Sequence, residues 1–255
     1  MTAGKLAGKT ALVTGSTRGL GRTMAEWLAD EGASIVVSGR DAEPVQASVD
    51  AVKAYGVDAI GIPADLSIYE EAHRLADEAL SAVGQIDILV NNAGMSTRKS
   101  FWEYTDADWE YQVNVNVRSP FILAQEIAKH FIEKEIRGRI VNISTIGAQS
   151  CHKDAAIYNL AKGGVEVMTR NMAFELGPYG ITVNCIAPGA IADKPGTPPR
   201  PEHAAYGKKH IPFGRVGKST DIAAAVLFFC LPESEFTTGQ TLLIDGGHAS
   251  YLPGQ

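Results

Sequence analysis

The chain has 255 residues, of which 45% are hydrophobic and 20% are charged, and its formal net charge is −6. A mildly acidic chain without a basic block lacks the electrostatic footprint of a nucleic-acid-binding protein. Its longest apolar run, Ile222–Leu231, is much shorter than the ~20 residues of a membrane span, and Met1–Lys9 contains no apolar signal-peptide core. We therefore expect a cytoplasmic protein that binds a small molecule, and neither nucleic acid nor a membrane.

Short β-branched runs alternate with stretches of helical periodicity along the whole chain. This alternation is typical of βα units and a parallel sheet, and several runs are nearly all apolar, as in strands covered on both faces. The sequence therefore predicts a single α/β domain over residues 1–255, with a doubly wound, seven-stranded parallel sheet and helices on both faces. The predicted strands are Thr10–Thr14, Ser34–Ser38, Ala59–Ile62, Ile86–Val90, Arg139–Ile143, Thr182–Ile186 and Thr241–Ile244.

The C-terminal third contains the clearest helix boundaries. Gly177-Pro178 is expected to end a helix that starts near Tyr158, and Ser219 or Thr220 to cap a helix through Ile222–Leu231. The Pro-rich segment Lys194–Pro201 is either a plain surface loop or the opening of a lid-like substrate segment over about 192–213.

Cysteine content excludes two further classes of protein. The chain has only three cysteines, Cys151, Cys185 and Cys230, and an odd number of this size does not indicate a disulfide framework. None of them has a CxxC partner of the kind that binds zinc, so no metal site is predicted.

A glycine-rich turn, Thr14–Gly21, follows the first predicted strand and leads directly into helical residues 22–30. Glycines in such a turn let the backbone approach a pyrophosphate, whose charge meets the positive end of the following helix. The spacing is GxxxGxG and not GxGxxG, so on its own the turn is also compatible with a tight βα connection that binds nothing.

Further motifs follow this turn in a fixed order, and together they resemble those of the short-chain dehydrogenase/reductase family over essentially the whole chain. The resemblance implies a Rossmann-type fold, a nicotinamide cofactor, hydride transfer between a carbonyl and a secondary alcohol, and a homotetramer. The matching residues are Thr14–Gly21, Asp65-Leu66, Asn91–Gly94, Asn116, Tyr158 with Lys162, and Asn184–Gly189.

The end of the second strand indicates which nicotinamide cofactor is used. An acidic residue there binds the adenosine ribose 2′-OH, but this chain has Gly39 followed by Arg40. With Arg18 in the glycine-rich turn, two guanidinium groups could bracket a 2′-phosphate, which favours NADP(H) over NAD(H). Alternatively both arginines are solvated, and Asp41 would weaken the preference.

The family resemblance extends the cofactor site to both ends of the dinucleotide. It implies Asp65 and Leu66 at the adenine and Asn92–Gly94 at the nicotinamide ribose. The residues assigned to the cofactor are Gly15, Thr17, Arg18, Gly19, Leu20, Gly21, Arg40, Asp65, Leu66, Asn92, Ala93, Gly94, Val115, Ile143, Tyr158, Lys162, Pro188, Gly189 and Ile191.

Tyr158 and Lys162 are four residues apart on a predicted helix, so their side chains share one face. An adjacent ammonium and an oxidised nicotinamide favour the phenolate and lower the pKa of the tyrosine, which suits it to exchange a proton with substrate. The resemblance also implies that Lys162 binds the nicotinamide ribose and that Asn116, with Asn114 as a nearby decoy, holds a water linked to Lys162.

Two positions depart from the family pattern. The family has a serine thirteen residues before the tyrosine to hold the substrate oxygen, and this count selects Thr145, with Ser144 as the alternative. Adjacent residues leaving a strand point in opposite directions, so the register decides between them. The second departure is Asp193, where the family usually has a threonine that contacts the nicotinamide carboxamide.

The sequence says least about the substrate. Candidate contacts are Ser96, Arg98, Gln149 and His152, and Arg98 after Asn-Ala-Gly resembles family members that act on sugars, polyols and sugar acids. A sugar, polyol or small ketone is therefore expected. Two alternatives are a 3-oxoacyl-carrier-protein reductase and, in a different class, a catalytically weak NADP(H)-binding sensor or scaffold.

Overall fold

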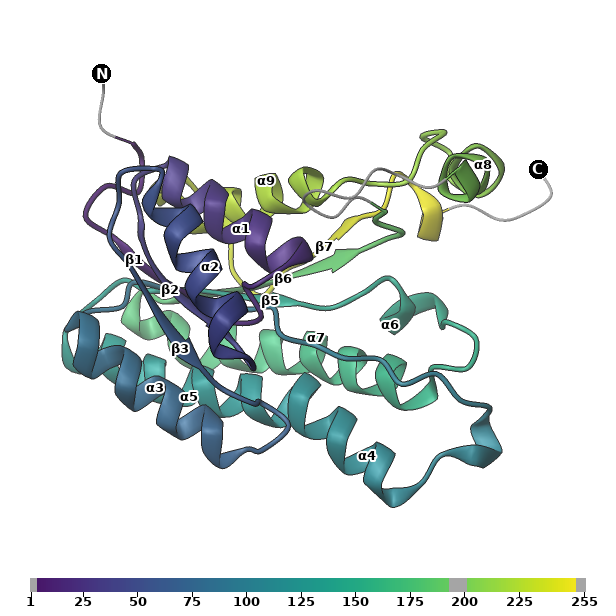
Figure 1. Cartoon of the computed structure of the whole chain (residues 1–255), viewed down its shortest axis with the longest axis horizontal. Coiled ribbons are helices and arrows are strands. Elements are labelled where there is room, and N and C mark those ends of the chain that lie inside the picture. Colours follow the sequence, from purple (N-terminus) through teal and green to yellow (C-terminus); the bar gives the residue numbers. More distant parts are fainter. Residues whose placement is uncertain (1–3, 193–200, 251–255) are drawn as a thin grey trace.

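The computed structural model describes residues 4–192 and 201–250 of the chain. These residues contain a seven-stranded parallel sheet in the order β3-β2-β1-β4-β5-β6-β7, which confirms the predicted doubly wound α/β fold (Figure 1). The strands are β1 Thr10–Val13, β2 Ser34–Gly39, β3 Ala59–Pro63, β4 Ile88–Asn91, β5 Arg139–Ile143, β6 Thr182–Pro188 and β7 Thr241–Ile244.

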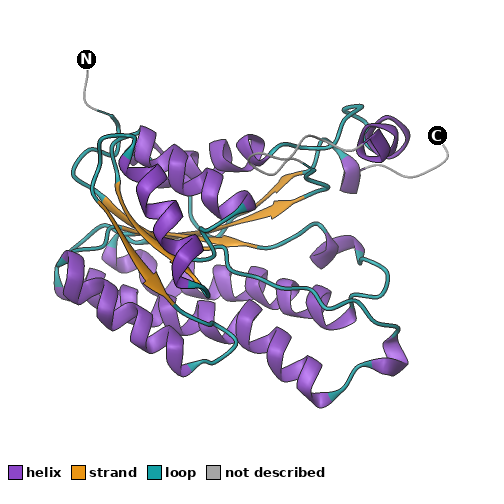
Figure 2. Ribbon diagram, in the orientation of Figure 1, coloured by secondary structure: helices purple, strands orange, loops and turns teal. Residues whose placement is uncertain are grey.

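Helices cover both faces of this sheet (Figure 2). The first, second and ninth helices lie on one face, whereas the third, fifth and seventh lie on the other. The helices are α1 Gly19–Asp30, α2 Ala42–Lys53, α3 Glu70–Val83, α4 Asp106–Val113, α5 Ser119–Glu133, α6 Gly147–Ser150, α7 Ala156–Leu176, α8 Pro201–His210 and α9 Ser219–Cys230.

Successive side chains of the central strands point to opposite faces of the sheet, so each strand contributes to both apolar cores between the sheet and the helices. In β1, Ala11 and Val13 pack toward α1 and α9, whereas Leu12 packs toward α3 and α5. All three are fully buried, as expected of a strand whose successive side chains enter opposite cores. The uniformly apolar strand sequences therefore follow from the two helical layers.

Five of the seven strands differ from their predicted bounds by one or two residues. The second, third and sixth strands end at Gly39, Pro63 and Pro188, and the fourth strand is Ile88–Asn91 and not Ile86–Val90. The Asp87 carboxylate before the fourth strand binds Lys9 Nζ at 2.9 Å and the Thr10 backbone N–H at 3.0 Å. The first strand ends at Val13, one residue before Thr14 begins the glycine-rich turn.

The predicted helix boundaries need one correction. Helix α7 ends at Leu176, directly before Gly177-Pro178 as expected, and begins at Ala156. Helix α9, however, is capped by Lys218, whose backbone N–H donates to Asp221 at 2.8 Å, so the predicted Ser219 or Thr220 cap is wrong.

The strand order changes direction between β1 and β4, because the chain runs outward from β1 to β3 and then returns to the other side. Ligands of open α/β sheets bind in the crevice at the carboxyl ends of strands beside such a point. Within the described parts of the chain, no helix is long and apolar enough to cross a membrane.

Candidate active site

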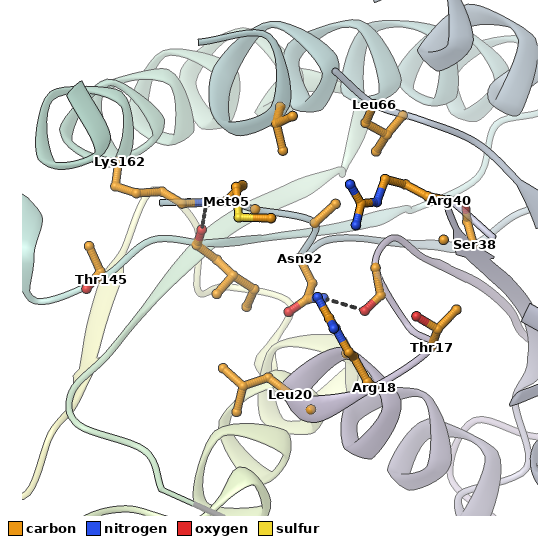
Figure 3. A pocket seen from close by; sticks show the side chains of 18 of the residues that line it. Thr17, Arg18, Leu20, Ser38, Arg40, Leu66, Asn92, Met95, Thr145 and Lys162 are labelled. Atoms are coloured by element: carbon orange, nitrogen blue, oxygen red, sulfur yellow. Dashed lines mark hydrogen bonds between the residues drawn. The ribbon is translucent and has the colours of Figure 1, made fainter. Parts of the chain in front are cut away.

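A cavity of about 560 Å³ opens at the carboxyl ends of the central strands, where the strand order reverses (Figure 3). Every residue that the sequence assigns to the cofactor lines it, together with Thr145. The remaining lining residues are Ser38, Gly39, Ala64, Met95, Tyr111 and Ser144.

The glycine-rich turn forms one wall of the cavity and requires two of its glycines. Gly15 has a φ of +63°, which side-chain-bearing residues rarely adopt, and a Cβ on Gly21 would collide with the Gly15 carbonyl oxygen. Helix α1 then starts at Gly19 with no acidic residue in its first turn. Its free N–H groups and positive end suit the phosphates of a dinucleotide.

The loop after β4 is attached to this turn by hydrogen bonds. Thr14 Oγ1 accepts from the backbone N–H groups of Asn92 and Ala93, both at 3.0 Å. The Asn92 amide donates back to the carbonyl oxygens of Thr14 at 2.8 Å and Gly15 at 3.1 Å. The glycine-rich turn and the loop after β4, which are far apart in the sequence, are therefore held together on one side of the cavity.

Two arginines face the cavity at the end of β2. Figure 3 shows the side chains of Arg18 and Arg40 projecting into it, and both are exposed. Neither forms an ion pair with any residue in the described ranges. A Cβ on Gly39 would lie 2.5 Å from Thr17 Cγ2, so an acidic residue at this position would displace Thr17.

Next to these arginines, Asp65 and Leu66 line the cavity beyond β3. Oδ1 of Asp65 accepts from the Ser67 backbone N–H at 3.0 Å and from the Ser67 hydroxyl at 2.8 Å. Among the described residues, Oδ2 has no hydrogen-bond donor, so this oxygen is available to an adenine amino group.

At the opposite end, Tyr158 and Lys162 extend from α7 toward the cavity. Lys162 is almost fully buried, its Nζ donates to the Ile143 carbonyl oxygen at 2.8 Å, and burial lowers its pKa to about 8. Nζ lies 6.0 Å from the centre of the Tyr158 ring.

The predicted effect of Lys162 on Tyr158 is corrected for the protein without its cofactor. Burial raises the pKa of Tyr158, and the charge that opposes this rise is that of Arg98 and not of Lys162. The lysine ammonium points to the Ile143 carbonyl oxygen, which explains why it contributes little to the phenol.

The strand register separates the hydroxyl groups of Ser144 and Thr145. Backbone pairing continues past β5, since Ser144 N–H donates to Ile186 O at 2.7 Å and Ile146 N–H to Pro188 O at 3.1 Å. Ser144 Oγ lies 3.1 Å from Lys162 O, on the side of α7, whereas the Thr145 side chain lies on the cavity wall (Figure 3). The Ser144 hydroxyl is therefore held against α7, and the choice of Thr145 as the hydroxyl that meets the substrate stays a prediction.

Comparison with known proteins agrees with this geometry. A sequence profile described as enoyl-(acyl carrier protein) reductase matches residues 15–249. The chain belongs to the short-chain dehydrogenase/reductase family. It is accordingly an NAD(P)-dependent oxidoreductase that interconverts carbonyl and alcohol groups on small molecules.

Two curated relatives of this dehydrogenase/reductase cover nearly the whole chain. The 3-oxoacyl-[acyl-carrier-protein] reductase FabG of Aquifex aeolicus is 36% identical over 244 residues, covering 95% of this chain and 98% of that protein. Glucose 1-dehydrogenase 2 of Bacillus subtilis is 34% identical over 249 residues, covering 96% of each.

Two solved structures have the same fold as this dehydrogenase/reductase. Acetoin dehydrogenase YohF from Salmonella typhimurium matches with a TM-score of 0.90 and 34% identity over 97% of this chain and 98% of that one. A blue fluorescent protein from a metagenomic library, in complex with NADPH, matches with a TM-score of 0.86 and 32% identity over 96% and 99%.

In this dehydrogenase/reductase, Asn116 lies beneath the cavity and not on its wall. It is buried in a π-helical turn, Asn114–Arg118, where its amide donates to the carbonyl oxygens of Met95 and Gln112, both at 2.8 Å. The nearby Asn114 instead donates to Ser67 O at 3.1 Å, on the adenine side. Asn116 therefore anchors the loop after β4, and its predicted role in a water relay stays a prediction.

The four predicted substrate residues lie outside the cavity wall. Ser96 and Arg98 are on the loop after β4, and His152 is on the loop between α6 and α7. These loops are joined by a hydrogen bond from Lys99 N–H to Asp154 O at 3.0 Å. Arg98 is exposed and lowers the pKa of His152, although burial is the larger cause of that shift.

Gln149 is the candidate whose placement argues against a substrate contact. Its amide Nε2 donates to the Glu166 carboxylate at 3.3 Å, which turns the side chain toward α7. The predicted substrate contact of Gln149 stays a prediction, because position near α7 in the sequence does not specify the direction of the side chain.

Sequence reasoning missed Ala64, Met95 and Tyr111 on the cavity wall. Met95 directly follows the Asn-Ala-Gly motif, so its position in the sequence could have indicated that it lines the cavity. Tyr111 lines the cavity from α4, and no sequence motif around it indicates this. Asp193 and most of Lys194–Pro201 lie outside the described residues, and α8 forms the later part of the predicted lid segment. No group of histidine, cysteine or acidic side chains in the described ranges is arranged to hold a metal ion.

Proposed function

We propose that this protein is an NADP(H)-dependent oxidoreductase in which Tyr158 is the general acid and base for a carbonyl and secondary alcohol pair. The observation that carries the proposal is one cavity with Thr145, Tyr158 and Lys162 at one end and, at the other, two arginines that form no ion pair with the described residues. The glycine cradle between them fits a dinucleotide, because added Cβ atoms would fill it.

When bound, the nicotinamide group donates or accepts a hydride at the substrate carbon. During reduction, the Thr145 hydroxyl holds the carbonyl oxygen while Tyr158 transfers its proton to that oxygen. During oxidation, the tyrosine takes the proton back. Lys162 holds the nicotinamide ribose, and the charge of Arg98 favours the phenolate form of Tyr158.

The preference for NADP(H) rests on charge at the end of β2. Arg18 and Arg40 are unpaired in the described parts of the chain, and no acidic side chain occupies position 39. Each charge-assisted hydrogen bond contributes roughly 1.5–3 kcal/mol, so two guanidinium groups favour a 2′-phosphate by more than one decade. The NADPH complex of a relative agrees with this preference.

We propose a sugar, a polyol or a small ketone as the substrate. The guanidinium of Arg98 acts on the pKa of both Tyr158 and His152, which favours a polar substrate near the proposed acid, and relatives include a glucose dehydrogenase and an acetoin dehydrogenase. A 3-oxoacyl thioester on a carrier protein is the second candidate, and the FabG relative favours it.

A homotetramer is also proposed, on two exposed apolar surfaces. Leu160, Val167 and Phe174 recur every seven residues on α7 and so lie on one side of the helix. Phe228 on α9 and Leu242 on β7 are exposed on another part of the protein. Light scattering of the purified protein tests the assembly, and a monomeric mass would contradict it.

The experiment that tests the function is a panel of sugars, polyols, small ketones and their alcohols, assayed in both directions with NADP(H) and NAD(H). Steady cofactor turnover is expected with at least one polar pair and more readily with NADP(H). Tight cofactor binding without turnover on any compound, including a 3-oxoacyl thioester, would favour the sensor or scaffold instead.

A further inference from the structure

Glu166 is a buried carboxylate that the proposed chemistry does not use. It lies on α7, one helical turn after Lys162, and is only 8% exposed. It forms no ion pair with any residue that the structure describes. Its two oxygens are held by neutral donors instead: Ser144 Oγ at 3.0 Å from Oε1 and Gln149 Nε2 at 3.3 Å from Oε2.

These two donors lie on either side of Thr145 in the chain. Ser144 immediately precedes it, and Gln149 is in the short helix α6 that follows it. Between them, Thr145 Oγ1 accepts from the Gly147 backbone N–H at 3.3 Å. One carboxylate therefore fastens both ends of the segment 144–149 to the helix that carries Tyr158.

The Ser144 end has an alternative acceptor on α7. Ser144 Oγ lies 3.1 Å from Lys162 O as well as 3.0 Å from Glu166 Oε1, so its single proton is shared between two acceptors and Lys162 O can take it when Glu166 is replaced. At the Gln149 end, the carboxylate is the sole side-chain partner within the described residues. Loss of Glu166 should therefore release α6 more than the end of β5.

A carboxylate buried without a cation costs free energy, and an apolar residue of similar size would avoid that cost. Its contribution must then lie in the geometry that its directional hydrogen bonds impose. We infer that Glu166 is a positioning residue, which clamps the segment 144–149 onto α7 and thereby sets the Thr145 hydroxyl relative to Tyr158. This inference rests on the proposed function, since it takes Thr145 and Tyr158 as the groups that meet the substrate oxygen.

Two substitutions of Glu166 separate the effect of its hydrogen bonds from the effect of its volume. Glu166→Leu keeps the volume but accepts no hydrogen bond, and it should lower kcat about tenfold or more, because small displacements of reacting groups are costly. The KM for substrate and the Kd for NADP(H) should change less than twofold. Glu166→Gln should restore most of kcat, because its amide oxygen still accepts from Ser144, and Gln149 can turn its own oxygen toward the new NH₂ group.

The neighbouring residue Gln149 gives a test that does not alter the buried carboxylate. Gln149→Leu should lower kcat a few-fold at unchanged KM if Gln149 belongs to the clamp. A raised KM at unchanged kcat would instead make Gln149 a substrate contact and overturn the inference. The matched control is Glu175→Leu, the same substitution at an exposed carboxylate of α7, which should keep parental rates.

Amide hydrogen exchange provides the readout that does not depend on turnover. In Glu166→Leu, exchange should accelerate in residues 144–151, while the glycine-rich turn and α9 stay as in the parent protein. Unchanged amide exchange in residues 144–151 of Glu166→Leu would overturn the clamp, whatever the turnover rate of the variant is. A folded Glu166→Leu protein with the kcat of the parent protein would overturn it as well. Absence of turnover in the parent protein, with the full compound panel, would instead contradict the proposed function.

Discussion

The two ends of the cavity are built differently. At the cofactor end, backbone groups and glycines define the shape, and the side chains of Thr14 and Asn92 join two motifs by hydrogen bonds to main-chain groups. At the other end, the wall consists of side chains from separate elements, such as Tyr111 of α4, Thr145 after β5 and Tyr158 of α7. The difference indicates that cofactor binding tolerates substitutions at the catalytic end, whereas catalysis depends on how distant segments pack.

The largest expected effect is that of Lys162→Ala. Turnover should fall by at least about 10², because the substitution removes the proposed ligand of the nicotinamide ribose, and small displacements of reacting groups are costly. Affinity for NADP(H) should also weaken. Stopped-flow kinetics and calorimetry on the same variant check both, and unchanged cofactor affinity would show that the lysine does not hold the ribose.

A second prediction concerns the stability of the cofactor-free protein. Burial lowers the pKa of Lys162 from its ordinary 10.5 to about 8. The unfolded chain therefore holds this proton more tightly than the folded protein. The free-energy penalty of burying the charged lysine is complete below pH 8 and is relieved as the pH rises from 8 to 10.5. Lys162→Met should stabilise the protein by up to about 3 kcal/mol at pH 7, and less near pH 10.

Chemical denaturation at the two pH values measures this difference. The hydrogen bond from Lys162 Nζ to Ile143 O is lost in the variant and reduces the gain. A Lys162→Met protein that is less stable than the parent at pH 7 would show that this hydrogen bond outweighs the burial penalty.

The cofactor end can be tested independently of catalysis. The parent protein should bind NADP(H) at least tenfold more tightly than NAD(H), because each charge-assisted contact to the 2′-phosphate contributes about one decade. Arg40→Asp should reverse the order, since it removes an attraction and adds a repulsion. Calorimetric titration with both cofactors measures the ratio, and preference of the parent for NAD(H) would contradict the assignment.

The smallest effects compare two adjacent hydroxyl groups. Thr145→Ala should lower kcat/KM by about tenfold or more, because a donor aimed at the developing oxyanion contributes ~2.7–4 kcal/mol in comparable sites. Ser144→Ala should be mild, since its hydroxyl faces α7. Thr145→Ser deletes only a methyl group and should leave activity equal or improved. Greater damage from Ser144→Ala than from Thr145→Ala would reverse the assignment.

The sequence predicted the fold and the lining of the cavity beside the glycine-rich turn well, because both depend on local spacing. Strand periodicity gave all seven strands within two residues at their ends, and the glycine-rich turn is a contiguous motif. The errors are confined to the ends of elements, where periodicity is weakest. The fourth strand begins two residues later than expected, and α9 is capped at Lys218, one residue before the predicted position.

The catalytic end shows a different limit. Counting residues selected Thr145, and strand alternation explained why Ser144 faces the other way. Counting could not reveal that Gln149 turns toward Glu166, nor that Tyr111 reaches the cavity from α4. Those directions depend on the packing of α4, α6 and α7, which no short motif encodes.

Tyr158→Phe tests the central claim most directly, because it removes one oxygen atom and leaves the ring that lines the cavity. The account predicts that this variant binds NADP(H) with parental affinity and loses turnover by a factor of about 10² or more, the usual contribution of a general acid or base. Cofactor binding and steady-state turnover measured on one preparation decide it. Near-parental turnover in Tyr158→Phe would contradict the mechanism.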